Sequence, residues 1–512
     1  MSTETQPVAG AAQQASKASL DKDLHKLEQL ESATRSLSRQ LRGPGLALVF
    51  LALSAILATF QAGAETSTII LIVAAVLAGY MALNIGANDV ANNVGPAVGS
   101  KALTMTGALV IAAIFEAMGA LIAGGDVVKT ISKGIIDPGQ VADAKIFINV
   151  MLAALVASAV WVNLATWIGA PVSTTHAVVG GVVGAGVAAA GFGLVDWHIM
   201  AAIVASWIVS PLMGGIIAAA FLALIKHFVI YREDKIAAAR TWVPLLIAVM
   251  VGTFTAYLLM KGVAKLWKPS ISIITLLSLG TFAAAFLALR PIIRRQSALL
   301  ENRNQSLRRL FHLPLICSAA LLSFAHGAND VANAVGPLAG ILHAAQSGDV
   351  AGNVKLPLWI MLIGAAGISL GLFLFGPKLI RTVGEQITRM NPMRAFCVAL
   401  SAAITVIIAS ALGLPVSSTH IAVGAVFGVG FFREYYTTHS RRRREYMARK
   451  NRNARTKATT SADPALDLND LIRRKLVRRS HFTVIIAAWL ITVPAAALMS
   501  AMTYWLISRF TM

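Results

Sequence analysis

The sequence predicts an all-α polytopic membrane protein with about 10–12 membrane segments, organised as two inverted-topology repeats that contain broken or re-entrant helices. Three observations predict this fold class: an apolar composition, two motifs that each occur twice, and the placement of the basic residues. Of the 512 residues, 57% are hydrophobic and only 13% are charged, which is more apolar than a water-soluble protein requires. The bilayer is therefore the expected solvent for most of the chain.

Apolar stretches close to the roughly 20 residues needed to cross a bilayer recur along the chain. Residues 1–45 contain no such stretch, so we expect no cleavable signal there but a cytoplasmic segment with an amphipathic helix at 20–42. The expected spans cover residues 44–63, 67–84, 103–124, 146–169, 198–225, 242–260, 271–289, 356–375, 394–413 and 482–508.

The net charge of +21 lies between the apolar stretches, so it indicates membrane topology rather than nucleic-acid binding. Basic clusters precede the first span and occupy residues 226–240, 290–309 and 433–479. Because loops rich in Lys and Arg stay in the cytoplasm, these clusters place the N-terminus inside the cell. A weaker cluster at 261–268 falls on the outer side and departs from the rule.

Two motifs show that the chain is internally duplicated. GANDVANNVGP at 86–96 returns as GANDVANAVGP at 327–337, with one difference in 11 positions, and PVSTTH at 171–176 returns as PVSSTH at 415–420. The offset between copies is 241 residues for the first motif and 244 for the second, so the two halves have kept nearly the same spacing.

The charge map and the duplication together divide the chain into parts. Counting spans from one basic loop to the next starts the two repeats on opposite faces of the membrane, which places a shared site near the bilayer midplane. The expected parts are the N-terminal segment 1–45, a first transmembrane helix at 46–66, repeat 1 at 67–225, a linker with two transmembrane helices and basic loops at 226–312, and repeat 2 at 313–508, which includes the basic cytoplasmic loop 433–479.

Both motifs are expected to interrupt or restart a helix inside the membrane. Gly, Asn and Pro in the first motif disfavour a continuous helix, and the Ser/Thr run of the second motif suits a helix start with a hydroxyl cap. Non-helical backbone at membrane depth is tolerated where it lines a protein-walled cavity. The four motif segments are therefore predicted to surround one cavity.

The hydroxyl runs indicate a site for an oxyanion. A helix start offers backbone N–H donors and a partial positive charge, and neutral hydroxyls match the oxygens of a tetrahedral anion without holding it as strongly as an Arg clamp would. The alternative is that the hydroxyls only cap the helices. The six candidates are Ser173, Thr174, Thr175, Ser417, Ser418 and Thr419.

Asp89 and Asp330 would repel an oxyanion at low dielectric, so they require a compensating positive charge. An aspartate inside a membrane span marks function by default. The two carboxylates could be ionised and bind cations, or they could carry protons because desolvation disfavours the charge. Either route makes anion binding depend on a cation; alternatively, these residues only cap broken helices. The amides that could supply further oxygen ligands are Asn88, Asn92, Asn329 and Asn333.

Glu116 lies within an apolar span and breaks the similarity of the two halves, because the aligned residue is Gly364. It is either a proton or cation coupling site or a hydrogen-bonded structural carboxyl. His326 aligns with Ile85, so the sequence gives it no place in a scheme shared by both halves.

At these motifs the chain resembles the inorganic phosphate transporter family, whose hallmark is a duplicated GANDxAN sequence. The resemblance extends from about residue 67 to residue 508 and implies a sodium- or proton-coupled phosphate symporter with an inverted-repeat fold. It implies a multi-pass protein of the cell membrane that is not an enzyme and needs no cofactor or metal beyond its coupling ion, with lipids as neighbours and a homodimer left open. Phosphate would be bound by Asn88, Asp89, Ser173, Thr174, Thr175, Asn329, Asp330, Ser417, Ser418 and Thr419, and the cations by Asp89, Asn92, Asp330, Asn333 and Glu116.

Three other functions compete with this interpretation. A symporter of sulfate or another oxyanion would share every feature above, whereas a passive channel would not need paired intramembrane carboxylates. An intramembrane hydrolase would use Ser173 or Ser417 with His176 or His420. Catalysis needs distinct acid, base and nucleophile roles at one centre, which two nearly identical halves do not favour. No Cys or third His completes a metal set with the two histidines, so we expect them to be buried and neutral.

Overall fold

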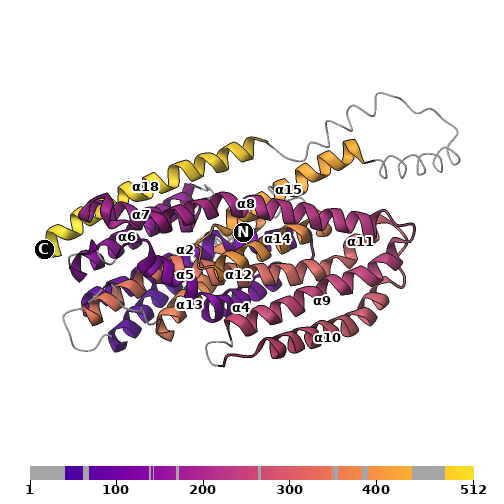
Figure 1. Ribbon diagram of the computed structural model, residues 1–512, viewed down its shortest axis with the longest axis horizontal. Coiled ribbons are helices and arrows are strands. Elements are labelled where there is room, and N and C mark those ends of the chain that lie inside the picture. The colour runs from indigo at the N-terminus through magenta and orange to yellow at the C-terminus, as the bar shows by residue number, and fades with distance from the viewer. Residues whose placement is uncertain are drawn as a thin grey trace, which may run out of the picture. The chain divides into compact units, whose positions relative to one another are not determined.

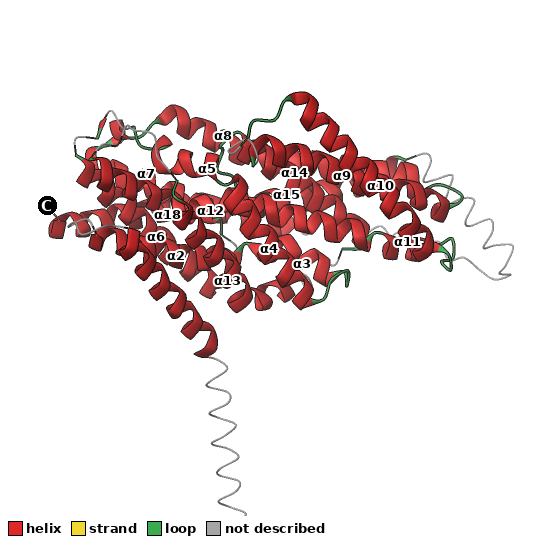
Figure 2. Cartoon of the chain, turned by 90° about the horizontal axis from the view of Figure 1, so that it is seen from below, coloured by secondary structure: helices red, strands yellow, loops and turns green. Residues whose placement is uncertain are grey.

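A computed structural model describes residues 41–61, 68–137, 140–141, 143–168, 172–262, 267–348, 350, 356–382, 390–440 and 479–511. The described residues form helices and loops, with one isolated antiparallel bridge between Ile136 and Val195 (Figure 2). Eleven helices among them are long and apolar enough to cross a membrane, the first being Leu41–Gln61. The prediction of an all-α polytopic protein is therefore confirmed.

The chain divides into two compact units, Met1–Ala52 and Leu53–Met512, and the description that follows concerns the second. Most of the predicted amphipathic helix (20–40) and most of the basic loop (441–478) lie outside the described residues. The first half of the second unit contains α2 (Thr68–Asn88), α3 (Val90–Gly99), α4 (Met105–Ala123), α5 (Gly125–Lys129), the π-helical turn η1 (Thr130–Gly134), α6 (Ala144–Ile168), α7 (Thr174–Ala190), η3 (Phe192–Leu194), α8 (Trp197–Ile225) and η4 (Lys226–Ile230).

The rest of the chain begins with a helical hairpin in which α9 and α10 lie side by side (Figure 1). This hairpin supplies the two spans expected in the linker. The remaining elements are α9 (Lys235–Lys261), α10 (Ile271–Ser297), α11 (Asn304–Leu310), α12 (His312–Ser347), α13 (Leu358–Thr382), α14 (Pro392–Ala411), α15 (Ser418–His439) and α18 (Arg479–Thr511).

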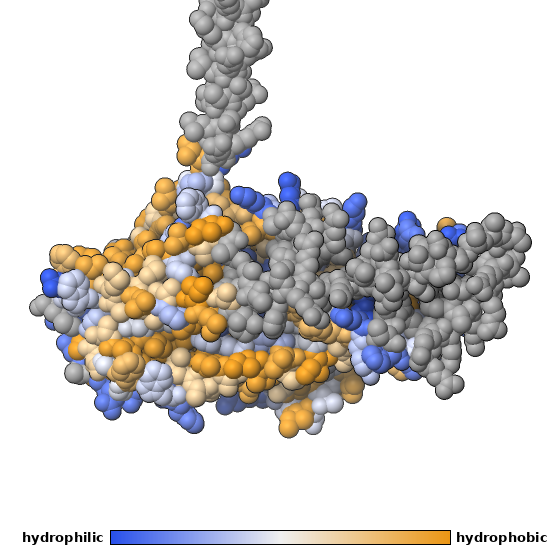
Figure 3. All heavy atoms as spheres, turned by 90° about the horizontal axis from the view of Figure 1, so that it is seen from above, coloured by the Kyte–Doolittle hydropathy of each residue, from blue (hydrophilic) through white to orange (hydrophobic). Residues whose placement is uncertain are grey.

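The outer surface agrees with a lipid environment. Figure 3 shows apolar side chains over much of the visible face and hydrophilic side chains gathered at its margins. Helix α10, which packs mainly on α9, has no buried residue in its most apolar 18-residue window. Apolar side chains exposed over such lengths are stable in hydrocarbon and would be costly in water.

The two halves are joined by close helix pairs in which each half provides one partner. Helix α2 packs along α13, and α4 packs along α12. A Cβ atom added at Gly86 would overlap the carbonyl group of Ile368, and one added at Gly327 would overlap the carbonyl group of Glu116. Gly86 and Gly327 are the same position of the repeated motif, so one contact occurs twice with the halves exchanged.

This packing corrects the alignment of the two halves around Glu116. The residue that occupies the equivalent place is Ile368, not Gly364, because each packs its backbone against the motif glycine of the other half. Gly119 and Gly371, each three residues further on, repeat the pattern against α12 and α2. The apolar spans of the two halves are too dissimilar for sequence alone to align them residue by residue. The close backbone contacts in the structure determine that alignment.

The first motif is less disruptive than expected. In the first half only Asp89 separates α2 from α3, and in the second half α12 runs without interruption from His312 to Ser347, through Pro337. The prediction of a broken helix is therefore wrong for the second copy. Residues 314–342 of α12 are almost all buried, and its asparagine side chains bond to neighbouring segments instead of competing for their own backbone. Tertiary packing thus outweighs the local tendency of Gly, Asn and Pro.

We expect Gly327→Val to destabilise the protein by about 1–3 kcal/mol or more, because the added side chain would push α12 away from the backbone of α4. The measurement is thermal unfolding of the purified protein in detergent. Gly280→Val is the control, since no atom lies within 4 Å of a Cβ added there. Equal melting temperatures for the two variants would contradict the close contact.

Candidate functional site

The second motif starts a helix in both halves, as predicted. Helix α7 begins after Ser173, whose hydroxyl accepts a hydrogen bond from the backbone N–H of His176 (3.2 Å). Helix α15 begins after Ser417, whose hydroxyl accepts from the N–H of His420 (3.4 Å). Ser173 Oγ also lies 2.7 Å from His176 Nδ1, so this hydroxyl is engaged twice within its own motif. In this structure both serines cap their helices.

Asp89 is the point at which hydroxyl groups of both halves converge. Its Oδ2 accepts a hydrogen bond from the Thr174 hydroxyl (2.8 Å), and its Oδ1 accepts from the Thr419 hydroxyl (3.3 Å). Asn88 Nδ2 also donates to Oδ1 (3.3 Å). Asp89 is only 2% exposed, so these neutral donors are what balance its carboxylate in the described structure.

A second pair of contacts crosses between the halves. Asn92 of the first half donates to the Thr419 hydroxyl (2.9 Å), and Asn333 of the second half donates to the Thr175 hydroxyl (3.1 Å). Asn92 and Asn333 hold the same position of the first motif, and the two threonines hold the same position of the second. The four motif segments therefore meet in one place through a contact that is made twice.

Asn329 holds the backbone that leads into α15. Its side-chain oxygen accepts from the N–H of Val416 (3.1 Å), and its amide nitrogen donates to the Leu414 carbonyl (3.1 Å) and to the Ser410 hydroxyl (3.0 Å). Its counterpart Asn88 donates to the carbonyl that precedes Ser173, at 3.4 Å. Both asparagines bond to the backbone just before the second motif's hydroxyl run, so in this structure they position the segments that lead into α7 and α15.

The second carboxylate, Asp330, has an incomplete set of partners. Its Oδ2 lies 2.9 Å from His326 Nε2 and 3.5 Å from the Ser418 hydroxyl. Within the part of the chain that the structure describes, its Oδ1 has no hydrogen-bond partner, and neither does Asn333 Oδ1, although both atoms are buried. Buried oxygen acceptors without donors are uncommon and suit a cation. Ligand atoms of Asp89, His326 and Asp330 all lie within 4.8 Å of one another.

Glu116 and His326 form a buried pair beside this cluster. His326 Nδ1 lies 2.7 Å from Glu116 Oε2, and Asn93 donates to Glu116 Oε1 at 2.8 Å. Both members of the pair are fully buried. In the other half the equivalent positions hold Ile368 and Ile85, so the polar pair occurs on one side only.

His326 is absent from the residues that the sequence predicts for the site, although it links two of them. The reason is that its alignment with Ile85 removes it from any scheme common to both halves. A usable signal was nevertheless present: Glu116 and His326 are each a polar residue without a polar counterpart, and they come from different halves. Two unmatched ionisable residues in apolar sequence are candidates to be each other's partner.

The cluster contains more carboxyl groups than basic groups. Asp89, Asp330 and Glu116 are three carboxyl groups around one imidazole, that of His326, so the ionised cluster would carry an excess of negative charge. Such an excess is costly in a low-dielectric interior and repels an entering anion. Cations or protons at the carboxylates remove both costs.

The two histidines of the second motif are buried, as predicted. His176 stacks on Trp207 with ring centroids 3.8 Å apart and meets the edge of His420 at 4.8 Å. The described residues offer these histidines no cluster of metal ligands, because the one such group contains His326 and two aspartates. The His176 ring thus combines aromatic packing with the polar contact of its Nδ1 to the Ser173 hydroxyl.

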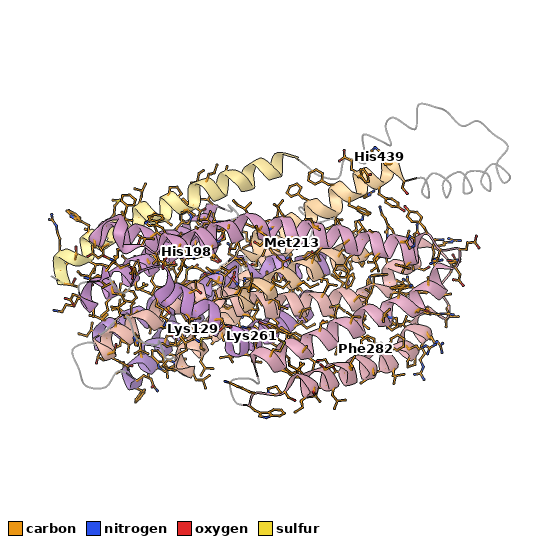
Figure 4. The ribbon with its side chains drawn as sticks, in the orientation of Figure 1. Lys129, His198, Met213, Lys261, Phe282 and His439 are labelled. Carbon is orange, nitrogen blue, oxygen red and sulfur yellow. The ribbon has the colours of Figure 1, made fainter. Side chains whose placement is uncertain are left out.

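Lys261 connects the linker hairpin to both halves of the site. Figure 4 labels this residue at the end of α9, where its ammonium donates to Asp126 Oδ2 (2.7 Å) and to the Ala411 carbonyl (2.9 Å). Thr130 donates to the carbonyl of Gly413 at 2.6 Å. These contacts hold the loop that runs from α14 to the start of α15.

We expect Lys261→Met to raise the KM for transported solute about two- to fivefold, with little effect on kcat, because a half-exposed ion pair contributes no more than about 1 kcal/mol. Initial uptake rates over a range of substrate concentrations measure this change. Lys261→Arg should restore much of the wild-type KM, and the exposed Lys129→Met should leave it unchanged. An unaltered KM for Lys261→Met would remove its positioning role.

Buried carboxylates within a bundle of apolar helices mark paths for ions and solutes, so the fold and the site define a multi-pass membrane transporter. The chain belongs to the phosphate transporter family, whose pattern matches residues 85–500. A Helicobacter pylori protein named "Putative phosphate permease" is 47% identical over 524 residues, which cover 94% of this chain and 98% of that protein. A permease of Pyrococcus abyssi with the same description is 36% identical over 434 residues, covering 83% of this chain and 94% of its own.

A solved structure supports the same family assignment. It is described as "The sodium-dependent phosphate transporter", and it superposes on this chain with a TM-score of 0.75 at 35% sequence identity. The match covers 86% of this chain and 99% of the other. Both repeated motifs lie within the family match, so the resemblance inferred from them is confirmed.

Proposed function

We propose that this protein carries inorganic phosphate across the cell membrane by symport with a cation, sodium in the first place. The observation that carries the proposal is the cluster of buried oxygens at Asp89, Asp330 and Asn333, two of which lack donors among the described residues, beside hydroxyl groups from both halves. The family supports phosphate as the solute, and the sodium dependence in the description of the solved relative supports the ion.

The hydrogen bonds of Asp89 suggest how the cation and the anion are coupled. Without a cation, the hydroxyls of Thr174 and Thr419 point at this carboxylate and are not available to an anion. A cation at Asp89 takes over the balancing of its charge, which releases both hydroxyls to donate to phosphate. Anion affinity is then high only when the carboxylate is neutralised, which is the physical requirement for symport.

Protons are the alternative coupling ion, and the Glu116–His326 pair is the observation that favours them. The pair joins an imidazole to carboxylates on both of its nitrogens, at 2.7 and 2.9 Å. A proton could bind to this arrangement or leave it while the side chains themselves stay in the buried cluster. Sodium remains the first choice, because Asp330 Oδ1 and Asn333 Oδ1 lack donors among the described residues and are hard oxygen ligands.

A second candidate function is symport of sulfate or another tetrahedral oxyanion. The hydroxyl donors are neutral and match the oxygens of sulfate as well as those of phosphate. Discrimination would come from the protonated oxygen of phosphate, which can donate a hydrogen bond to an acceptor such as Asn333 Oδ1, whereas sulfate cannot.

The test is uptake of radiolabelled phosphate into proteoliposomes that contain the purified protein. Sodium and proton gradients are imposed separately, and a hundredfold excess of unlabelled sulfate is the competitor. Phosphate accumulation driven by a gradient and unchanged by sulfate is expected, with protein-free vesicles as the control. Absence of accumulation under both gradients would refute symport, and displacement by sulfate would reassign the substrate.

A further inference from the structure

An apolar groove of about 650 Å³ lies between α8 and α15. The two helices approach closely through glycines: a Cβ at Gly424 would overlap the carbonyl of Pro211, and one at Gly428 would overlap that of Gly215. The groove runs along this contact, and Gly215, Gly424 and Gly428 are among the residues that line it. Its walls include Ile208, Leu212, Ile216, Phe427, Phe431 and Tyr435.

The dimensions and exposure of the groove suit a single hydrocarbon chain. Its wall on α15 runs from His420 to Tyr435, which is about 22 Å along the helix axis. Half of a bilayer's hydrocarbon core is about 15 Å thick, so the groove is long enough for the acyl chain of one leaflet and the start of a headgroup. Leu212 and Ile216 are 62% and 63% exposed, so the described residues do not cover these walls.

Cationic side chains gather at the Tyr435 end of the groove. Lys226 is 8% exposed, and its ammonium lies 5.0 Å from the ring centroid of Phe432, a groove residue, and 4.2 Å from that of Tyr436. Arg433 follows Phe432 in α15 and is partly exposed. Lysine and arginine side chains form charge-assisted hydrogen bonds with phosphate groups.

The predicted topology assigns this end of the groove to the cytoplasmic leaflet. Helix α15 leads directly into the most basic loop of the chain, beginning with Arg441 to Arg444, which the predicted topology places in the cytoplasm. Figure 4 labels His439 at this end of α15. Anionic lipids are concentrated in the cytoplasmic leaflet of the membrane.

We propose that the groove binds one anionic phospholipid of the cytoplasmic leaflet, with an acyl chain along α8 and α15 and its phosphodiester group at Lys226 and Arg433. The opposite end of the groove reaches His420, in the first turn of α15, whose N–H bonds the Ser417 cap. The lipid therefore supports the helix that carries the second set of oxyanion donors. This last consequence rests on the proposed function, whereas lipid binding itself does not.

Native mass spectrometry of the full-length protein tests the proposal, with dioleoylphosphatidylglycerol as the anionic probe and dioleoylphosphatidylcholine as the neutral one. We expect one phosphatidylglycerol molecule to be retained, with at least about fivefold preference over phosphatidylcholine, as one or two charge contacts provide. Ala219→Trp fills the groove and should abolish retention. Ala220→Trp, at the neighbouring exposed position outside the groove, should retain the lipid.

Lys226→Gln separates the headgroup contact from the groove itself. This variant should lose most of the preference for phosphatidylglycerol and keep its melting temperature in lipid-free detergent, which excludes a folding defect. Equal retention of the two lipids by the wild type, or unchanged retention by Ala219→Trp, would overturn the proposal. A disulfide-linked dimer formed by Leu212→Cys would also overturn it, because a second copy of the chain would then cover the groove.

The functional consequence has a separate readout. Uptake into vesicles of phosphatidylcholine alone should be at least about threefold slower than into vesicles with one fifth phosphatidylglycerol, and Ala219→Trp should remove this difference. Lipid binding without an effect on uptake would overturn the support of α15 and leave the binding site standing. Absence of uptake in every vesicle with lipid retained would instead count against the proposed function.

Discussion

Asp89→Asn and Asp330→Asn are each expected to lower gradient-driven phosphate uptake by at least about 30-fold while leaving the protein folded in the membrane. Each substitution preserves the shape of the side chain and one oxygen acceptor but removes the charge that would bind a cation. Loss of one contact to a charged group corresponds to about 2 kcal/mol or more. Uptake into proteoliposomes, normalised to inserted protein, measures the effect.

The two variants should also differ from each other. Asp89 receives the hydroxyls of Thr174 and Thr419, so Asp89→Asn weakens the hold on both donors and changes phosphate affinity as well as cation affinity. Asp330 has an unpartnered oxygen among the described residues, so its variant should affect chiefly the concentration dependence on the cation. Asp143→Asn, at an exposed position, is the control. Normal coupled uptake by both variants would exclude these carboxylates from coupling.

Replacing Glu116 and His326 together by isoleucine is expected to leave a folded protein whose phosphate uptake is reduced about tenfold or more. The double variant copies the Ile368–Ile85 pair found at the equivalent positions of the other half, where apolar side chains are fully buried. Exchange of a buried ion pair for apolar residues of similar volume is often neutral for stability or stabilising. A loss of uptake without a loss of stability would thus identify the pair as functional.

Single substitutions of this pair give a sharper test. Glu116→Gln leaves His326 with one carboxylate instead of two, so uptake should fall because the buried pair loses one of its charged partners. In a double-mutant cycle with His326→Gln, the two effects should fall short of additivity by about 1 kcal/mol or more, because the side chains are in contact. Uptake at the wild-type rate in Glu116→Gln would show that this carboxyl group has only a structural role.

Several features of the site follow from local sequence. The hydroxyl caps at Ser173 and Ser417 were predictable, because a Ser/Thr run directly before an apolar stretch suits a helix start. The meeting of the four motifs was predictable from their duplication. By contrast, the positioning role of Asn329 could not be read from its motif, where it looks like any other amide beside an aspartate.

The sequence by itself determined the solvent, the class of fold, the duplication and the family of this protein, because hydropathy is a local property and two nearly identical motifs leave little ambiguity. Only the tertiary structure decided that α12 passes unbroken through its motif, that Ile368 faces Gly86, and that Glu116 bonds His326. Each of these depends on contacts between residues far apart in the chain. In a fully buried site such contacts, rather than local preference, set both the backbone path and the partner of every charge.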